Sequence, residues 1–162
     1  MEQAIVSAVT HAVTEAKVTV SGVPDQPGIA ARLFRELADA EVNVDMIVQN
    51  VSDHGVTDIS FTTPRDDLDA AVAVCESMAG EIGATGVRSD KDIARVSIIG
   101  AGMKSNPGVA ARMFATLADD GINIEMISTS AIRISCVVRE DQVEQAVAAL
   151  HGAFELSAPD TP

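Results

Sequence analysis

The chain has 162 residues, a formal net charge of −13 at pH 7 and 47% hydrophobic residues, with no Trp or Tyr. This length suits one ordinary domain or two small ones, and the aliphatic composition predicts a folded protein with a close-packed core. Because the negative charge would repel a phosphate backbone and no apolar run approaches the roughly 20 residues of a spanning helix, we expect no nucleic-acid partner and no membrane span. The N-terminus lacks the basic start of a secretory signal, so a cytoplasmic protein is expected.

The first 90 residues predict a leading strand and then a βαββαβ unit. Ala4–Val9 is the strand-like leading segment. Apolar spacing and turn residues then predict, in chain order, a strand, a helix, two strands joined by a turn, a second helix and a short strand: Ala16–Gly22, a helix from Pro27, Val44–Val51, Thr57–Thr62, a helix from Pro64 to near Gly80, and Thr85–Arg88. This order is the ferredoxin-like split βαβ arrangement.

The remainder of the chain repeats the unit, since Pro27–Ile47 and Pro107–Ile127 are identical at 12 of 21 aligned positions. The second copy predicts a strand, a helix, two strands and a helix: Ala94–Ile99, Pro107–Asp120, Ile124–Thr129, Ile132–Val138 and Asp141–His151. Little chain is left for a final strand, so we infer that the leading segment completes the second sheet. The predicted class is α+β, with a first repeat over 15–90, a second over 1–14 and 91–156, and a flexible tail over 157–162.

Metal, cofactor and catalytic chemistry are not expected in this chain. His11, His54 and His151 fall in different elements without Cys or carboxylate partners at ligand spacing. Cys75 and Cys136 stand far apart among small apolar residues, so we interpret them as buried reduced thiols. With no Walker sequence and no kinase signature, the chain is not expected to catalyse phosphoryl transfer by itself.

Two strand-to-helix loops, 23–28 and 103–108, carry the remaining candidate chemistry. In each loop Pro and Gly fall in the first turn of a helix, where free backbone N–H groups and the helix dipole favour an anion. The alternative is a simple helix start with Asp25 or Asn106 as the cap. Recurrence of Pro-Gly-x-Ala-Ala-Arg weakens this alternative, although shared ancestry would also explain the recurrence.

A second repeated pair is Asn43-Val44-Asp45 and Asn123-Ile124-Glu125, at the start of the second strand of each unit. A carboxamide, backbone carbonyls and a carboxylate at such a place can hold an ammonium group. The alternative is a turn residue followed by an edge strand. Taken with the helix starts, the pair describes a site for a free amino acid to which each unit supplies half.

The segments KVTVSGVPDQPGIAARLFRELADAEVNVDMIVQNVS and GAGMKSNPGVAARMFATLADDGINIEMISTS, followed by IRIS, resemble the regulatory region of aspartate kinases over nearly the whole chain. The resemblance implies two ACT-type βαββαβ repeats whose sheets pair across a homodimer. Because the sequence begins with Met and lacks a kinase domain, it resembles the separate β subunit of an α2β2 enzyme. The resemblance then implies feedback inhibition of the catalytic α subunit by threonine and lysine, which are end products of aspartate-family amino-acid biosynthesis. A stand-alone ACT-domain sensor acting on another enzyme or regulator is the alternative.

The resemblance also implies two effector sites, each between a first repeat and a second repeat of different chains. The threonine-type site would use seven residues: Asp25, Gly28, Ile29, Ala30 and Gln49, with Asn123 and Ile124. The second site would use eight: Met103, Ser105, Pro107, Gly108 and Val109, with Asn43, Val44 and Asp45. Relatives often have Glu where this chain has Ala131, which leaves the lysine response of the second site open.

Overall fold

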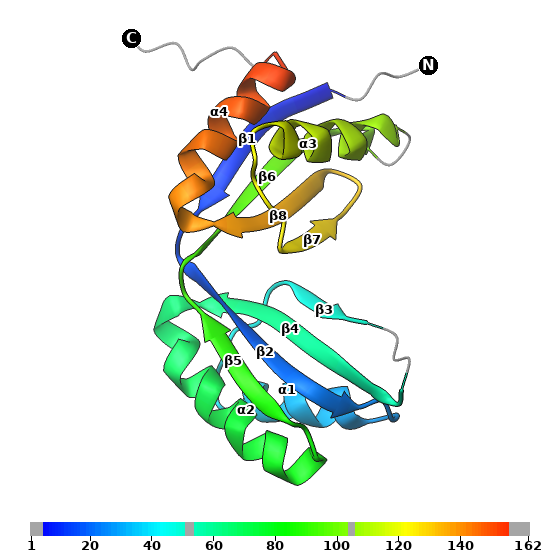
Figure 1. The fold of residues 1–162 in the computed structure, drawn as a ribbon, viewed down its shortest axis with the longest axis vertical. Coiled ribbons are helices and arrows are strands. Elements are labelled where there is room, and N and C mark those ends of the chain that lie inside the picture. Colours follow the sequence, from blue (N-terminus) through cyan, green and yellow to red (C-terminus); the bar gives the residue numbers. More distant parts are fainter. Residues whose placement is uncertain (1–4, 51–53, 104–105, 156–162) are drawn as a thin grey trace. The chain divides into compact units, whose positions relative to one another are not determined.

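A computed structural model describes residues 5–50, 54–103 and 106–155, and the chain forms two compact units (Figure 1). One unit is Thr14–Lys91, called the first repeat below. The other unit joins Met1–Val13 with Asp92–Pro162 and is called the second repeat. The chain therefore passes between the two units twice, once after Val13 and once after Lys91.

The first repeat is a four-stranded antiparallel sheet with two helices on one face (Figure 1). The sheet order is β3-β4-β2-β5. Its elements are β2 (Glu15–Pro24), α1 (Ile29–Asp39), β3 (Ile47–Gln49), β4 (Val56–Pro64), a 3-10 turn (Arg65–Asp67), α2 (Leu68–Ile82) and β5 (Gly86–Asp90).

The core of the first repeat lies between the sheet and its helices. Val18 and Val20 of β2 pack with Phe61 of β4 against Leu33 and Leu37 of α1, and all five side chains are fully buried. The spacing of 33 and 37 places both leucines on one helix face, as the 3.6-residue period requires. Since successive strand residues alternate in direction, the residues of β2 between these valines point to the sheet face without helices.

The second repeat has the same architecture, with the N-terminal strand in the place that β5 holds in the first repeat. Its sheet order is β1-β6-β8-β7, and β1 runs antiparallel to β6 from the pair Ile5↔Ala101 to the pair Ala12↔Arg95. The elements are β1 (Ile5–Ala12), β6 (Ile93–Ala101), α3 (Gly108–Asp119), β7 (Met126–Thr129), β8 (Arg133–Arg139), a 3-10 turn (Glu140–Gln142) and α4 (Val143–Ala153).

The core of the second repeat follows the same plan. Val96 and Ile98 of β6 pack with Met113 and Leu117 of α3 and with Leu150 of α4, and each of these side chains is fully buried. Among the described residues, no helix is both long enough and apolar enough to cross a membrane.

The predicted α+β class and the ferredoxin-like order of both repeats are confirmed, but several element boundaries were wrong. Helix α1 begins at Ile29 rather than Pro27, because Gly28 adopts a left-handed φ of 90° that an α-helix does not contain. Strand β3 covers only Ile47–Gln49 of the predicted Val44–Val51, whose last residue lies outside the described part.

The helix-free face of each sheet carries a pair of hydroxyl groups at its centre. Thr19 Oγ1 lies 2.8 Å from Ser60 Oγ in the first repeat. Ser97 Oγ lies 2.7 Å from Ser135 Oγ in the second repeat. Each pair joins directly opposed residues of neighbouring strands, which is the arrangement that lets cross-strand side chains bond.

Candidate functional site

The loop from β2 to α1 is shaped by backbone hydrogen bonds. The Asp25 N–H donates to the Gly55 carbonyl oxygen at 2.9 Å, and the Ile29 N–H donates to the Gln26 carbonyl oxygen at 3.3 Å. Asp25 and Gly28 are exposed, whereas Ile29 and Ala30 are half-buried. The loop thus presents the first turn of α1, with the positive end of its dipole, to the surface.

Gly28 is needed for its backbone conformation and not for close packing. Its φ of 90° favours glycine, and a Cβ added there would meet no atom within 4 Å. The space above the start of α1 is therefore open on the first repeat. A ligand carboxylate can approach the backbone at this point without displacing a side chain.

The loop from β6 to α3 is built differently. The Asn106 side-chain amide donates to the Gly102 carbonyl oxygen at 3.0 Å, and the Val109 N–H donates to the Asn106 carbonyl oxygen at 3.1 Å. Met103 is buried, and Ser105, a candidate residue of the second site, lies outside the described residues.

The assigned helix starts place neither Asp25 nor Asn106 at the N-cap position. The residues at the N-cap positions are Gly28 for α1 and Pro107 for α3, and neither forms a side-chain capping hydrogen bond. At the start of α1 the cap position is therefore held by a glycine, which has no side-chain oxygen to offer to the first-turn N–H groups.

An open pocket of about 440 Å³ lies beside the β6–α3 loop. It combines residues from this loop, from the first turn of α3 and from the β7–β8 turn: Met103, Asn106, Pro107, Ala110, Thr129, Ser130, Ala131 and Ile134. Two candidate residues of the second site, Met103 and Pro107, thus meet a polar turn of which the sequence analysis had considered only Ala131. The duplication could have indicated this turn. Thr129 is 80 residues after Gln49, as Pro107 is 80 residues after Pro27, so Thr129 is the equivalent of a predicted residue of the threonine-type site.

A further pocket of about 300 Å³ holds Pro107, Gly108 and Val109, the other described candidates from this loop. It is completed by Asn106, the candidate cap, and by three residues that were not predicted for the site: Val6, Arg112 and Phe154. The Arg112 guanidinium lies 5.1 Å from the centre of the Phe154 ring and also donates to the Ala153 carbonyl oxygen. This stacking fixes the cation beside the start of α3.

The segment around Asn43 precedes its strand instead of beginning it, since β3 starts at Ile47. The Asn43 N–H donates to Asp67 Oδ2 at 3.1 Å, and the Thr63 hydroxyl donates to the Asn43 carbonyl oxygen at 2.6 Å. The Asn43 side chain is exposed. The backbone carbonyl is therefore already engaged, and the carboxamide is the group that remains available for a ligand.

The equivalent segment of the second repeat also precedes its strand, because β7 starts at Met126. Asn123 is exposed and Ile124 is half-buried. The Glu125 carboxylate lies 3.5 Å from an Arg139 guanidinium nitrogen, so its charge already has a partner. In both segments the asparagine side chain is exposed and can meet a ligand.

Within each repeat the structure describes only half of each predicted composite site. The first repeat holds Asp25, Gly28, Ile29 and Ala30 at the start of α1 and the exposed Gln49 at the end of β3. Asn123 and Ile124, the other half of the threonine-type site, belong to the second repeat. Their combination across two chains remains a prediction.

Comparisons with known proteins agree on one family. The ACT domain family matches residues 17–78 and 96–154. The chain is 43% identical to a solved structure of "aspartokinase alpha and beta subunits", covering 93% of this chain and 99% of that chain with a TM-score of 0.88. The regulatory subunit of aspartate kinase from Thermus thermophilus gives the same TM-score at 41% identity, with 92% and 98% coverage. The chain belongs to the aspartate kinase regulatory subunits.

The curated relatives are longer proteins. Aspartate kinase of Pseudomonas fluorescens strain SBW25 is 52% identical over 159 residues, which is 98% of this chain and 38% of that protein. Aspartokinase of Mycolicibacterium smegmatis is 50% identical and likewise matched over 38% of its length. The chain thus corresponds to the ACT region of these kinases and not to their catalytic part.

The ionisable groups of the two ACT repeats give no sign of nucleophilic or metal chemistry in the described ranges. Burial raises the pKa of the Cys75 thiol to about 11 and that of Cys136 to about 12. Both thiols are therefore protonated at neutral pH, which is the unreactive form. Among the residues that the structure describes, no group of three or more His, Cys, Asp or Glu is placed to hold a metal ion.

Proposed function

We propose that this chain is the regulatory part of a cytoplasmic aspartate kinase and binds threonine between ACT repeats of two copies. Binding would transmit feedback inhibition to a catalytic α subunit in aspartate-family amino-acid biosynthesis. The observation that carries the proposal is the open start of α1, where Gly28 leaves clear space over uncapped N–H groups in a chain of this family.

The described contacts suggest how threonine would be held. The Ile29 N–H already donates to Gln26, which leaves the N–H groups of Gly28 and Ala30 for the ligand carboxylate. Asp25 and Gln49, both exposed, supply acceptors for the ammonium group from the same repeat. Asn123 of a second chain would complete the site with its exposed carboxamide.

A site that needs two chains links binding to assembly. A ligand that binds only the dimer stabilises the dimer by mass action, and it biases a catalytic partner only by favouring one arrangement of the complex over another. The second site, at the start of α3, would respond in the same way to its own ligand. Its pocket contains Ala131 and no acidic side chain among the described lining residues, so lysine remains an open candidate there.

Calorimetric titration of the full chain with threonine tests the composite site. Ala30→Val adds bulk beside the carboxylate contact and Asn123→Ala removes the carboxamide, so each should weaken threonine binding about tenfold or more. Asn43→Ala is the matched control, because it removes the same group from the equivalent position of the other repeat. If Asn123→Ala leaves threonine affinity unchanged while Ala30→Val abolishes binding, the site is confined to the first repeat.

Co-purification with the catalytic subunit tests the regulatory role. We expect the two chains to form a complex whose aspartate phosphorylation falls when threonine is added. A chain that binds threonine as a self-sufficient dimer, without recruiting the catalytic subunit, would instead be a stand-alone sensor.

A further inference from the structure

The chain passes between the two repeats through two short connections, residues 13–14 and residues 91–92. Each connection has only two residues outside a strand, because β1 ends just before the first connection and β2 begins just after it, and β5 and β6 flank the second connection in the same way. An extended residue spans at most about 3.3–3.6 Å, so two residues leave little slack. The repeats are therefore joined by two short connections and not by one long linker.

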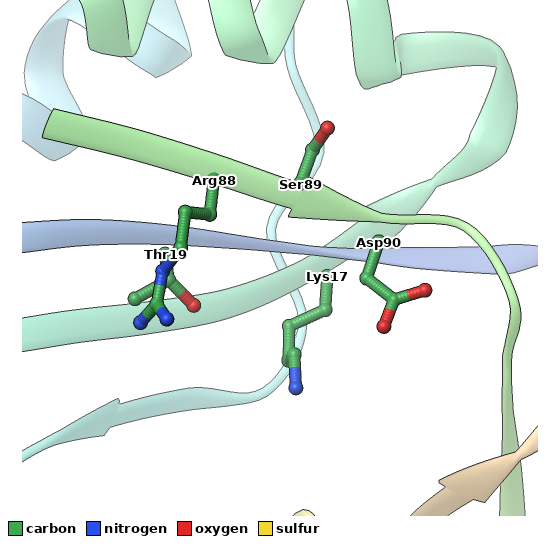
Figure 2. Close-up of a pocket in the computed structure, with 5 residues that line it drawn as sticks. All are labelled: Lys17, Thr19, Arg88, Ser89 and Asp90. Atoms are coloured by element: carbon green, nitrogen blue, oxygen red, sulfur yellow. The ribbon is translucent and has the colours of Figure 1, made fainter.

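The strand ladders that flank the two connections keep the same register. In the second repeat, the ladder of β1 and β6 ends with Ala12 opposite Arg95. In the first repeat, the ladder of β2 and β5 begins with Lys17 opposite Asp90, and Figure 2 shows these two side chains on the same side of their strands. Lys17 is five positions after Ala12, and Arg95 is five positions after Asp90. The two crossings therefore use the same number of residues.

Each connection is also held by the turn that leads into a helix of one repeat. In the first repeat, the Arg65 N–H donates to the Thr14 carbonyl oxygen at 2.9 Å. In the second repeat, the Glu140 N–H donates to the Asp92 carbonyl oxygen at 2.9 Å. Arg65 and Glu140 are the first residues of the 3-10 turns before α2 and α4. The first connection is thus anchored to the start of α2, and the second connection to the start of α4.

Two connections of equal length restrict motion more than one connection does. A repeat held by a single short connection can turn about the two soft backbone dihedrals of each connecting residue. A second connection of the same length removes most of these rotations, because both chains have to follow the same movement. A shift of α2 moves the anchor of the first connection and therefore changes the arrangements that are open to the second connection, which α4 anchors.

We propose that the two connections act as a matched pair that transmits conformational change between the repeats. The coupling depends on the equal length of the connections and on their anchors at the starts of α2 and α4. A ligand that favours one arrangement of a repeat then also biases the other repeat, which is what an allosteric response requires. The identification of that ligand as threonine rests on the function proposed above, whereas the coupling itself does not.

Duplication of the connections tests the role of their equal length. Duplicating residues 13–14 or residues 91–92 adds up to about 7 Å of slack to one connection and keeps the alternation of side chains along the strands. Duplicating both restores equal lengths. In differential scanning calorimetry, the unaltered chain and the double duplication should unfold in one transition, and each single duplication in two. Two transitions in the unaltered chain or the double duplication, or one transition in the single duplications, would overturn the proposal.

Two proline variants test the anchors without changing the length of the chain. Arg65→Pro removes the N–H that holds Thr14, and the turn tolerates proline there because Arg65 is its first residue and the preceding Pro64 has an extended ψ of 142°. Arg65→Ala is the matched control, since it loses the same side chain but keeps the N–H. Glu140→Pro and Glu140→Ala form the equivalent pair in the second repeat. Each proline variant should separate the unfolding transitions more than its alanine control does. If proline and alanine act alike at both positions, the anchors do not carry the coupling.

The regulatory consequence is measured in the complex with the catalytic subunit. At saturating threonine, a single duplication should lose most of the inhibition of aspartate phosphorylation, and the double duplication should regain it. Full inhibition in both single duplications would show that the matched connections do not transmit the threonine signal. If threonine fails to inhibit the complex of the unaltered chain, the function proposed above is wrong, and the calorimetric result still decides whether the repeats are coupled.

Discussion

Replacing Gly22 with alanine should strongly destabilise the first repeat. Gly22 has a φ of 65° and lies in the irregular stretch of β2 where the register with β4 shifts. A Cβ at this position would lie 2.5 Å from Thr85 Oγ1 and 2.7 Å from Thr85 Cγ2. Rotation of Thr85 away from this position would break the hydrogen bond that its hydroxyl donates to the Ser21 carbonyl oxygen at 3.0 Å.

Two separable effects set the size of the destabilisation expected for Gly22→Ala. The left-handed backbone costs an L-residue about 1–2 kcal/mol, and overpacking of this kind typically costs about 1–3 kcal/mol. Gly22→Ala should therefore lower the free energy of unfolding by about 2–5 kcal/mol. Gly55 is the matched control in the same repeat, since its φ is 78° but an added Cβ would meet nothing within 4 Å. Gly55→Ala should show only the first effect, about 1–2 kcal/mol.

Urea denaturation followed by circular dichroism measures both variants, and a double-mutant cycle isolates the clash. Thr85→Ala removes the two atoms that an alanine at position 22 would strike, so it should recover much of the loss in the Gly22→Ala background. The steric reasoning is refuted if Gly22→Ala costs no more than Gly55→Ala, or if Thr85→Ala recovers nothing.

Three further outcomes follow from the same structure. Cys75 and Cys136 should resist thiol reagents at pH 8 in the folded chain, because burial raises their pKa values from 9.0 to about 11 and about 12. As the pH rises above about 9, the unfolded chain releases these protons before the folded chain does. The free energy of unfolding should therefore fall above about pH 9. Deleting residues 1–10 removes most of β1 and exposes the edge of β6, so the melting temperature should fall by about 8 °C or more, or the chain should aggregate; an unchanged melting temperature would contradict this. Arg32→Ala removes an ion pair with Glu81 in which both side chains are more than half exposed. Urea denaturation should therefore show that the free energy of unfolding changes by less than about 0.5 kcal/mol.

The sequence predicted the fold well because periodicity and duplication report on the core. The apolar spacing of Leu33 and Leu37 predicted a helix face, and both residues are fully buried against the sheet. The family was also predicted correctly, from segments that together cover nearly the whole chain. Hydrophobic periodicity reflects the alternation of buried and exposed residues along the chain, and a single sequence displays it directly.

Boundaries and contacts depend on interactions that a linear pattern does not display. The strand predicted from Val44 begins only at Ile47, and the Asn43 N–H before it donates to Asp67, which is distant in sequence, rather than to a neighbouring strand. The contribution of Ser130 to the pocket beside α3 depends on the β7–β8 turn, where its N–H donates to the Arg133 carbonyl oxygen at 2.8 Å. Neither contact can be predicted from the spacing of apolar residues in the sequence.

The two copies of Pro-Gly-x-Ala-Ala-Arg show that repeated residues need not have repeated roles. Gly28 is a left-handed N-cap, whereas Gly108 is already the first residue of α3. The arginines diverge too, since Arg32 pairs with Glu81 at the surface and Arg112 stacks on Phe154. With different local partners at the two helix starts, the two sites have no physical reason to select the same ligand. Threonine and lysine should therefore be titrated against variants of each loop separately, because the affinity of a ligand at the start of α1 does not predict its affinity at the start of α3.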